Sequence, residues 1–357
     1  ASAPATNSSA APVAAATTGE RVVRPEFTGS AAEYFRIWIV NLFFTLITLG
    51  VYSAWAKVRK KRYFYGCTRI DGDTFDYFGS PKAVLKGRIV AVLLFVIYAF
   101  SVELYPASRF AFWAVLLLSL PWLVVRALTF NARNSAYRGV RFNFTASPRE
   151  AVRFYVGMPI VVGLSGGLAY PWFVARNKAF VVSHHALGTT GFGCELRVGA
   201  FYKIYFLSGL MLFALAAPIG GLMGFAMTKL ELPAMVEWAR FVVPVILMYA
   251  VYAVVYAYVQ ARTTNLLWNG AQGPGLRFAN TLEAGKLARL YIGNVIAAAA
   301  SAGLLIPWGV VRTFRYRLES FTMTLEGEDI HEANPALESV GATGQEFGDI
   351  FNLDIGL

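Results

Sequence analysis

Hydrophobic residues gather in seven stretches along the chain, separated by shorter segments in which apolar and polar residues alternate. Four of the stretches carry almost no charge and are 16 to 22 residues long: 89–105, 110–125, 206–227 and 241–261. A helix of roughly 20 residues crosses the ~30 Å hydrocarbon core of a bilayer. The pattern therefore predicts four transmembrane helices.

The other three stretches, 37–56, 154–175 and 290–311, lie inside a repeated unit of 39 residues. The unit begins at Arg21 and recurs from Arg138 and from Pro274. Without gaps, the first and second copies match at 11 positions, and the second and third match at 15. Such internal similarity indicates triplication. Six positions are the same in all three copies: Arg24/Arg141/Arg277, Thr28/Thr145/Thr281, Arg36/Arg153/Arg289, Gly50/Gly167/Gly303, Trp55/Trp172/Trp308 and Arg59/Arg176/Arg312.

Two membrane arrangements fit these seven stretches. If all seven cross the bilayer, the 32 basic residues divide 20 to 12 between the two faces. If the three repeat stretches dip in and return, the division becomes 29 to 3, which the positive-inside rule favours. Against this, each repeat stretch is long enough to cross, and inverted repeats are common in transporters. Both arrangements remain open at this stage.

The segments between the apolar stretches predict short strands. Residues 62–70 and 74–78 flank Asp71-Gly72-Asp73 and predict a β-hairpin, and residues 136–144 have a similar pattern. We therefore expect an all-α polytopic membrane protein with three internal repeats, each holding a transmembrane or re-entrant segment, and with small cytoplasmic β-hairpins. We expect residues 1–20 to be a disordered lead-in, 21–317 the integral membrane domain, and 318–357 an acidic disordered tail.

Composition agrees with a membrane protein. The chain of 357 residues is 57% hydrophobic and 15% charged, too apolar for an ordinary soluble enzyme. All 32 Lys and Arg lie within 21–317, together with 11 of the 21 acids, so this part has a net charge of +21. Because the basic residues cluster beside apolar stretches, we expect contact with anionic lipid headgroups and no binding of nucleic acid. The two cysteines, Cys67 and Cys194, argue against a disulfide framework and a cysteine metal site, and we expect no cofactor.

Three segments resemble a known family: Phe27 to Trp38, Thr48 to Gly66, and Thr129 to Phe142. They are similar to the YjgN-like family of bacterial inner-membrane proteins, and the resemblance covers most of the chain between its two ends. It implies a multi-pass protein of a bacterial inner membrane, in a family of unknown function, and it supplies no catalytic residues. The third copy differs most, with Asn280 where the others have Phe27 and Phe144.

A Trp-x-x-x-Arg motif lies at the end of each repeat stretch, and an arginine shared by the three copies lies near its start. Arg suits carboxylate and phosphate because its planar guanidinium binds them in two places. One interpretation is that these residues surround an anionic solute or a phospholipid headgroup; the other is that they only anchor the helices at the membrane surface. The candidate ligand-binding residues are Arg36, Trp55, Arg59, Arg153, Trp172, Arg176, Arg289, Trp308 and Arg312.

Two classes of function follow. The protein is a transporter, channel or binding protein for an anionic solute or lipid, or it is a structural or assembly protein of the inner membrane without a ligand. We expect no enzyme, because no constellation of His, Cys or acidic residues is evident. Asn41 and Asn294, at equivalent positions in the first and third copies, are expected to form hydrogen bonds between helices.

Overall fold

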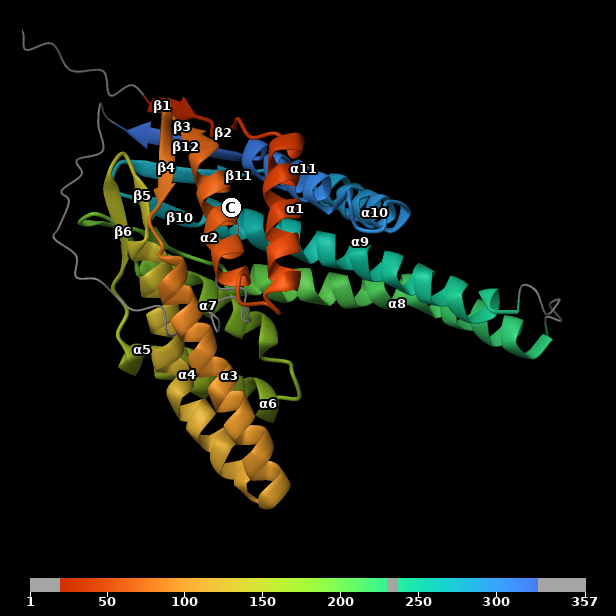
Figure 1. The fold of residues 1–357 in the computed structure, drawn as a ribbon. Helices are drawn as coiled ribbons and strands as arrows, with labels where there is room; N and C mark the ends of the chain where they lie inside the picture. Colours follow the sequence, from red (N-terminus) through yellow and green to blue (C-terminus); the bar gives the residue numbers. More distant parts are fainter. Residues whose placement is uncertain (1–19, 230–236, 327–357) are drawn as a thin grey trace, which may run out of the picture.

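The computed structural model describes residues 20–229 and 237–326. They form two sheets of short strands, from which helices extend (Figure 1). Four helices are long: α3 (Pro81–Leu104), α4 (Ser108–Arg133), α8 (Val198–Lys229) and α9 (Ala239–Asn269). Each covers one of the four stretches with almost no charge, α3 to within one residue, and is long and apolar enough to cross a membrane. The prediction of four membrane-spanning helices is confirmed by length and composition.

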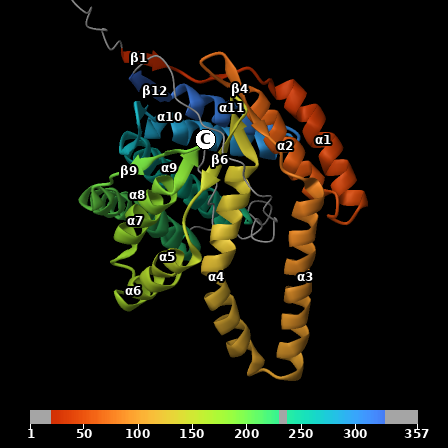
Figure 2. The ribbon, with the colours of Figure 1, turned by 90° about the vertical axis from the view of Figure 1, so that its left-hand side faces the viewer.

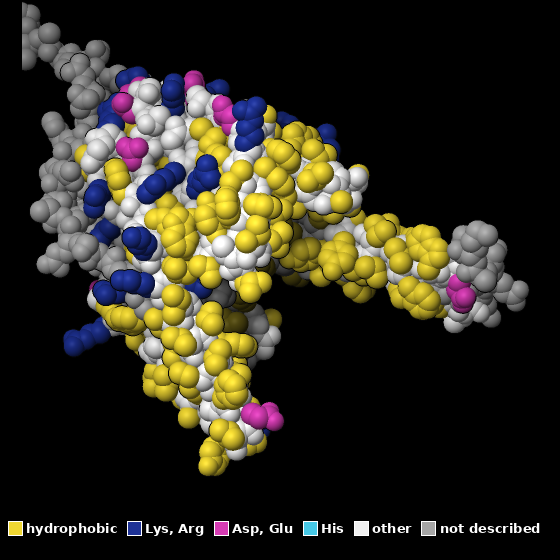
Figure 3. Space-filling view, in the orientation of Figure 1, with side chains coloured by type: hydrophobic (Ala, Val, Ile, Leu, Met, Phe, Trp, Pro, Cys, Tyr) yellow, Lys and Arg dark blue, Asp and Glu magenta, His cyan; other side chains and the backbone are white. Residues whose placement is uncertain are grey.

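The long helices form two arms, α3–α4 and α8–α9, that leave the body in different directions (Figure 1). In the turned view, the α3–α4 arm extends from the strands on its own (Figure 2). The arms are covered mainly by hydrophobic side chains, whereas most Lys and Arg side chains visible from this side gather over the body (Figure 3). This division places the apolar surface where a bilayer would contact it.

Three helical hairpins lie beside the arms. The first is α1 (Ala31–Ile47) with α2 (Ser53–Gly66), and the third is α10 (Ala284–Ala300) with α11 (Ile306–Glu319). The second joins α5 (Pro148–Val152), a π-helical turn η1 (Arg153–Gly157) and α6 (Met158–Leu164) to α7 (Tyr170–Ser183). The helices α1 and α2 have 17 and 14 residues, or about 25 and 21 Å at a rise of 1.5 Å per residue.

A glycine with positive φ reverses the chain in each hairpin. Gly50, Gly167 and Gly303 have φ of +93°, +89° and +90°, a region that other residues avoid. Their N–H groups donate to the carbonyl oxygens five residues earlier, over 2.7 to 2.9 Å. The three apolar repeat stretches therefore fold back on themselves, and none continues as a single long helix.

The strands form two antiparallel sheets. The order in one is β1-β12-β11-β10-β9, and in the other β2-β3-β4-β5-β6-β7-β8. Since β2 follows β1 after two residues and β9 follows β8 after one, the two sheets close into a ring, with residues of both in one apolar core. The strands are β1 (Glu20–Val23), β2 (Glu26–Phe27), β3 (Thr68–Ile70), β4 (Asp73–Tyr77), β5 (Ser135–Tyr137), β6 (Val140–Phe144), β7 (His185–Leu187), β8 (Thr190–Gly191), β9 (Gly193–Cys194), β10 (Ala271–Gly273), β11 (Leu276–Asn280) and β12 (Phe321–Glu326).

The strands correct two sequence-based expectations. Residues 62–66 belong to α2, so only 68–70 of the expected first strand is a strand. β3 pairs with β4 around Asp71 and Gly72, and β5 pairs with β6 in the second expected region, but both pairs are parts of the seven-stranded sheet. The expected tail boundary at residue 318 is also wrong, because β12 lies beyond it and pairs with both β11 and β1. Alternating burial along Phe321, Thr322 and Met323 explains the strand. Residues 1–19 and 327–357, expected to be disordered, lie outside the described residues.

Candidate functional site

A cavity of about 990 Å³ lies where the ring of strands meets the helices. Its size is at the upper end of the range for small-molecule sites, ~300–1,000 Å³. Aromatic and aliphatic side chains form most of its wall. The helices α2, α4, α7, α9, α10 and α11 contribute to it.

Several parts of the wall come in sets of three, spaced by 117 and 136 residues as in the sequence repeat. Four such sets line the cavity: Pro25/Phe142/Phe278, Tyr65/Val182/Leu318, Thr68/His185/Phe321 and Ile70/Leu187/Met323. Residues at equivalent offsets in three parts of the chain therefore contribute to the wall.

Three lysines of α2 line one side of the cavity. Lys57, Lys60 and Lys61 stand at the spacing i, i+3 and i+4, followed by Phe64 at i+7, so they share one helical face. Lys61 Nζ donates a hydrogen bond to Asn131 Oδ1 of α4 over 3.1 Å and lies 5.4 Å from the centre of the Tyr77 ring. The face that α2 turns toward the cavity is thus cationic and partly tied to α4.

A second polar group faces the cavity from the third hairpin. Arg317 Nη2 donates to Tyr291 Oη over 2.8 Å, and both residues line the cavity. Asn294 donates from Nδ2 to the carbonyl oxygen of Gly309 over 3.1 Å and to Thr313 Oγ1 over 2.8 Å. A Cβ at Gly309 would lie 2.9 Å from Asn294 Cγ, so glycine is needed for this close approach. The bonds from Asn294 join α10 to α11, as the sequence predicted.

The electrostatic character of the lining is one-sided. Lys57, Lys60, Lys61 and Arg317 are basic, and no described lining residue is Asp or Glu. Arg317 Nε is shielded from solvent and has no hydrogen-bond acceptor within the described part of the chain. A wall that carries four basic residues and no described carboxylate is chemically suited to an anionic guest.

The cavity is closed at the strand side by apolar residues. The core of the ring contains Val23, Ile70, Tyr137, Val140, Leu187, Leu276, Phe321 and Met323, several of which form the floor of the cavity. His185 also lines this end, and its Nδ1 lies 2.7 Å from the carbonyl oxygen of Val181. Burial holds the pKa of His185 below its ordinary value.

The nine residues selected from the sequence lie elsewhere. The arginines Arg36, Arg59, Arg153, Arg176, Arg289 and Arg312 are exposed, Trp55 and Trp172 are half-buried, and none of the nine lines the cavity. Arg312 lies over the Trp308 ring, 5.0 Å from its centre, so this motif pairs its own two side chains. The structure does not bring the nine residues into the cavity.

Sequence reasoning missed the cavity lysines, although it noted that basic residues cluster beside the apolar stretches. Conservation among the three copies directed attention to Arg59, whereas Lys57 and Lys60 are replaced by Val174 and Asn177 in the second copy and by Val310 and Thr313 in the third. The signal that could have found them is their i, i+3, i+4 spacing on one face of α2.

The fold and the four apolar helices define a polytopic, mostly helical integral membrane protein. The chain belongs to the family described as "Bacterial protein of unknown function (DUF898)", which matches residues 23–350.

Two relatives bear the name inner membrane protein YjgN. The chain is 32% identical to the protein of Salmonella typhimurium (strain LT2) over 140 residues, which are 38% of this chain and 35% of that protein. It is 29% identical to the protein of Escherichia coli (strain K12) over 150 residues, 40% of this chain and 36% of that protein. The chain thus spans about a third of the length of these relatives, and no solved structure matches it. The predicted family is confirmed, and the chain is a multi-pass inner-membrane protein.

Proposed function

We propose that this protein binds an anionic membrane lipid, with the headgroup held at the cavity face of α2. The observation that carries the proposal is an apolar cavity of about 990 Å³ lined by Lys57, Lys60, Lys61 and Arg317 and by no described carboxylate. A lipid combines the two properties that this wall would select, a negative headgroup and apolar chains.

A lipid suits the cavity better than a small water-soluble anion does. Among the described residues the floor of the cavity is mainly apolar, whereas a water-filled passage needs polar groups along its length. A fully hydrated ligand would leave most of the apolar wall in contact with water. Acyl chains would bury this surface, which contributes ~25 cal/mol of free energy per Å² of apolar area. We therefore favour a binding protein over a channel.

The proposal includes three copies of one unit arranged about the cavity, with their helical hairpins entering the membrane from the strand side and returning to it. Support comes from the backbone N–H of Thr28, Thr145 and Thr281, which donate to the carbonyl oxygens of Cys67, His184 and Ser320 over 2.9 Å in each case. These bonds hold both ends of each hairpin at the ring. Non-spanning backbone at membrane depth is tolerated where protein buries it or a cavity adjoins it. With this arrangement, the ring and its basic residues face the cytoplasm.

The experiment compares thermal stability of the purified protein in zwitterionic detergent with added phosphatidylglycerol, cardiolipin or phosphatidylcholine. We expect the two anionic lipids to raise Tm and phosphatidylcholine to have little effect. The triple variant Lys57→Gln, Lys60→Gln, Lys61→Gln should lose most of this shift. The matched control is Lys82→Gln with Lys86→Gln, two exposed lysines of α3 outside the cavity, which should keep it.

The variant Arg59→Gln, Arg176→Gln, Arg312→Gln tests the site suggested by the sequence motif. If this variant abolishes the lipid-dependent shift and the lysine variant does not, the headgroup binds on the outer surface and the cavity proposal is wrong. Inorganic phosphate and glycerophosphoglycerol test for a water-soluble ligand. If either raises Tm as much as the anionic lipids do, the ligand is an anionic solute. Absence of any shift with all anions would favour the structural or assembly role.

A further inference from the structure

We infer that the cavity is open at its side, next to the second hairpin, and that the acyl chains of the bound anionic lipid leave through this opening into the bilayer. The inference rests on the proposed function and adds the direction in which the chains leave. It follows from the unequal depth of the cavity wall on its two sides.

One side of the wall is tall. Lining residues of α11 run from Ile306 to Leu318, and those of α2 from Lys57 to Tyr65. At 1.5 Å per residue, the α11 wall reaches ~20 Å from the ring end of the helix, and the α2 wall ~14 Å. Helix α10 adds Tyr291, Asn294, Val295 and Ala298 to this side.

The other side of the wall is low. The lining residues of α4 fall within 128–132, next to the end of that helix at Arg133, while α7 contributes only Val182 and α9 only Trp268. All of these lie within ~8 Å of the ring. Beyond this height, α4 and α9 continue into the two arms, which diverge (Figure 1). On this side the described helices therefore wall the cavity only near the ring.

The second hairpin differs from the other two in a way that explains the low side. Val174, Asn177, Lys178 and Val181 of α7 occupy the positions of Lys57, Lys60, Lys61 and Phe64 in α2, yet none of them lines the cavity. Val181 instead packs with Val124 and Val125 of α4 and with Phe180 and Tyr155 in a separate core. The second hairpin thus packs against α4 and does not wall the cavity.

A local break in the helix accompanies this departure. The N–H of Met158 donates to the carbonyl oxygen of Arg153, five residues earlier, and the next residue is Pro159, which has no N–H to give. The first and third hairpins have Leu42 and Val295 at the position of Pro159, and α1 and α10 run without interruption. The π-turn therefore belongs to the hairpin that leaves the cavity unwalled.

The tall wall supplies a surface for acyl chains above the lysines. Val295, Ala298 and Ile306 line it, and Val295 is 66% exposed, so the cavity surface continues into the apolar outer surface of the hairpins. A headgroup at Lys57, Lys60 and Lys61 and chains along α10 and α11 would match the polarity of the wall along its length.

The test uses phosphatidylglycerol with a photoreactive diazirine on one acyl chain, at low abundance in phosphatidylcholine nanodiscs containing the full chain. Adducts are mapped by mass spectrometry. We expect adducts on residues 291–310 with the phosphatidylglycerol probe, and much weaker ones with a phosphatidylcholine probe carrying the same chain. Surface residues such as Leu93 and Phe95 of α3 should react equally with both probes.

Ala298→Trp should fill the chain region, while Ala299→Trp, on the exposed neighbouring position, is the matched control. If the added indole weakens lipid binding by ~1 kcal/mol, the specific adducts should fall about fivefold in Ala298→Trp. They should remain unchanged in Ala299→Trp. If phosphatidylglycerol stabilises the protein through the α2 lysines but both probes label 291–310 alike, the side opening is wrong and the proposed function stands. If phosphatidylglycerol gives no lysine-dependent stabilisation, both fall. Should Ala298→Trp not fold, the comparison of the two probes on the parent decides.

Discussion

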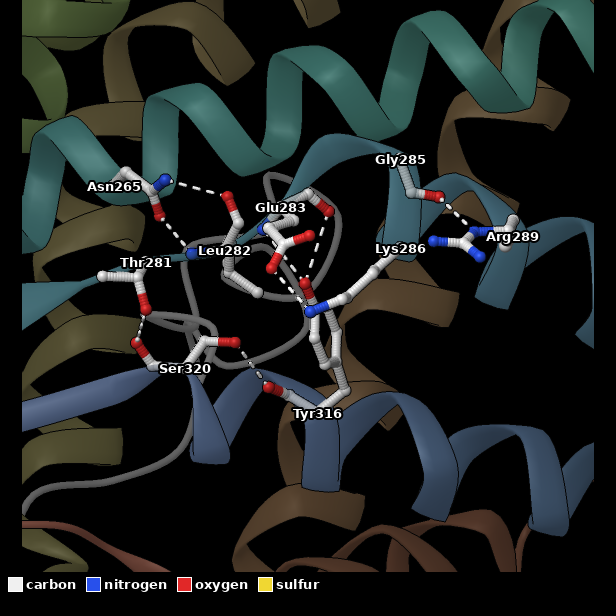
Figure 4. Close-up of polar contacts among 9 residues, drawn as sticks. All are labelled: Asn265, Thr281, Leu282, Glu283, Gly285, Lys286, Arg289, Tyr316 and Ser320. Carbon is white, nitrogen blue, oxygen red and sulfur yellow. Dashed lines mark hydrogen bonds and ion pairs between the residues drawn. The ribbon is translucent and has the colours of Figure 1, made fainter.

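Thr281 donates two hydrogen bonds to the carbonyl oxygen of Ser320, from its backbone N–H over 2.9 Å and from its hydroxyl over 3.3 Å. Figure 4 shows the hydroxyl bond. The pair joins the entry of the third hairpin to its exit, 39 residues later. Thr28 binds Cys67 and Thr145 binds His184 in the same way, with hydroxyl distances of 3.1 and 3.2 Å. Threonine at these three positions thus has a structural reason.

Replacing these threonines by valine keeps the shape and removes the hydroxyl donor. Because the backbone bond remains and the side chains are exposed, each of Thr28→Val, Thr145→Val and Thr281→Val should lower unfolding stability by up to ~1 kcal/mol. The sites are far apart, so the triple variant should lose about the sum. Equilibrium denaturation in detergent measures this, with Thr74→Val in β4 as the control. Equal stability of the triple variant and the parent would show that the hydroxyl bonds contribute nothing.

The hairpin turns depend on glycine for a different reason. Alanine at Gly50, Gly167 or Gly303 must adopt φ near +90°, which costs a non-glycine residue at least ~1 kcal/mol. Gly163→Ala in α6 is the control, because an added Cβ there meets open space and its φ is not positive. That control should gain up to ~1 kcal/mol from helix propensity. In thermal unfolding, the three turn variants should be less stable than the parent and Gly163→Ala more stable. A gain in stability at any turn glycine would contradict the assigned turn.

His185 should make stability depend on pH. Its pKa in the folded protein lies below the ordinary value of 6.5, so the unfolded chain takes up a proton that the folded chain does not. Stability should therefore fall as the pH decreases below about 6.5. His185→Phe, the residue type found at the equivalent position 321, should reduce the loss of Tm between pH 7.5 and 5.5. An unchanged loss would assign the pH dependence to other groups.

The two native cysteines test the membrane arrangement. Cys67 and Cys194 both lie at the ring, next to β3 and in β9, so a membrane-impermeant maleimide should reach them from the same face. In intact cells, the variants Cys67→Ser and Cys194→Ser should both remain unlabelled until the membrane is permeabilised. Burial raises the pKa of the Cys194 thiol to about 11 and also raises that of Cys67, so the reaction should be run above neutral pH. Labelling of one variant alone in intact cells would contradict hairpins that return to the ring.

The sequence predicted those features whose signal lies within one short stretch. The uncharged runs that became α3, α4, α8 and α9 could be recognised from hydropathy alone, and Gly50, Gly167 and Gly303 were visible as invariant glycines. Asn294 was correctly expected to bond between helices, because a polar side chain in an apolar segment needs a partner.

The ring and the cavity were not predictable in the same way. β1 pairs with β12 across some 300 residues, Val23 with Met323, and strands of two to six residues carry little pattern of their own. The lysines of α2 were hidden because none of them is shared by all three copies: Lys57 and Lys60 are lysine in the first copy alone, and Lys61 is matched by Lys178 but not in the third copy. The search for shared residues therefore selected exposed arginines. A cavity lined by residues from three similar segments need not use the residues that the segments share.

The claim that a lipid occupies the central cavity is tested most directly by native mass spectrometry of the protein purified gently from its own membrane. The account predicts a retained anionic phospholipid on the parent and on the Lys82→Gln, Lys86→Gln control, and its loss from the Lys57→Gln, Lys60→Gln, Lys61→Gln variant. A parent that retains no lipid, or retains zwitterionic and anionic lipids alike regardless of these lysines, would contradict it.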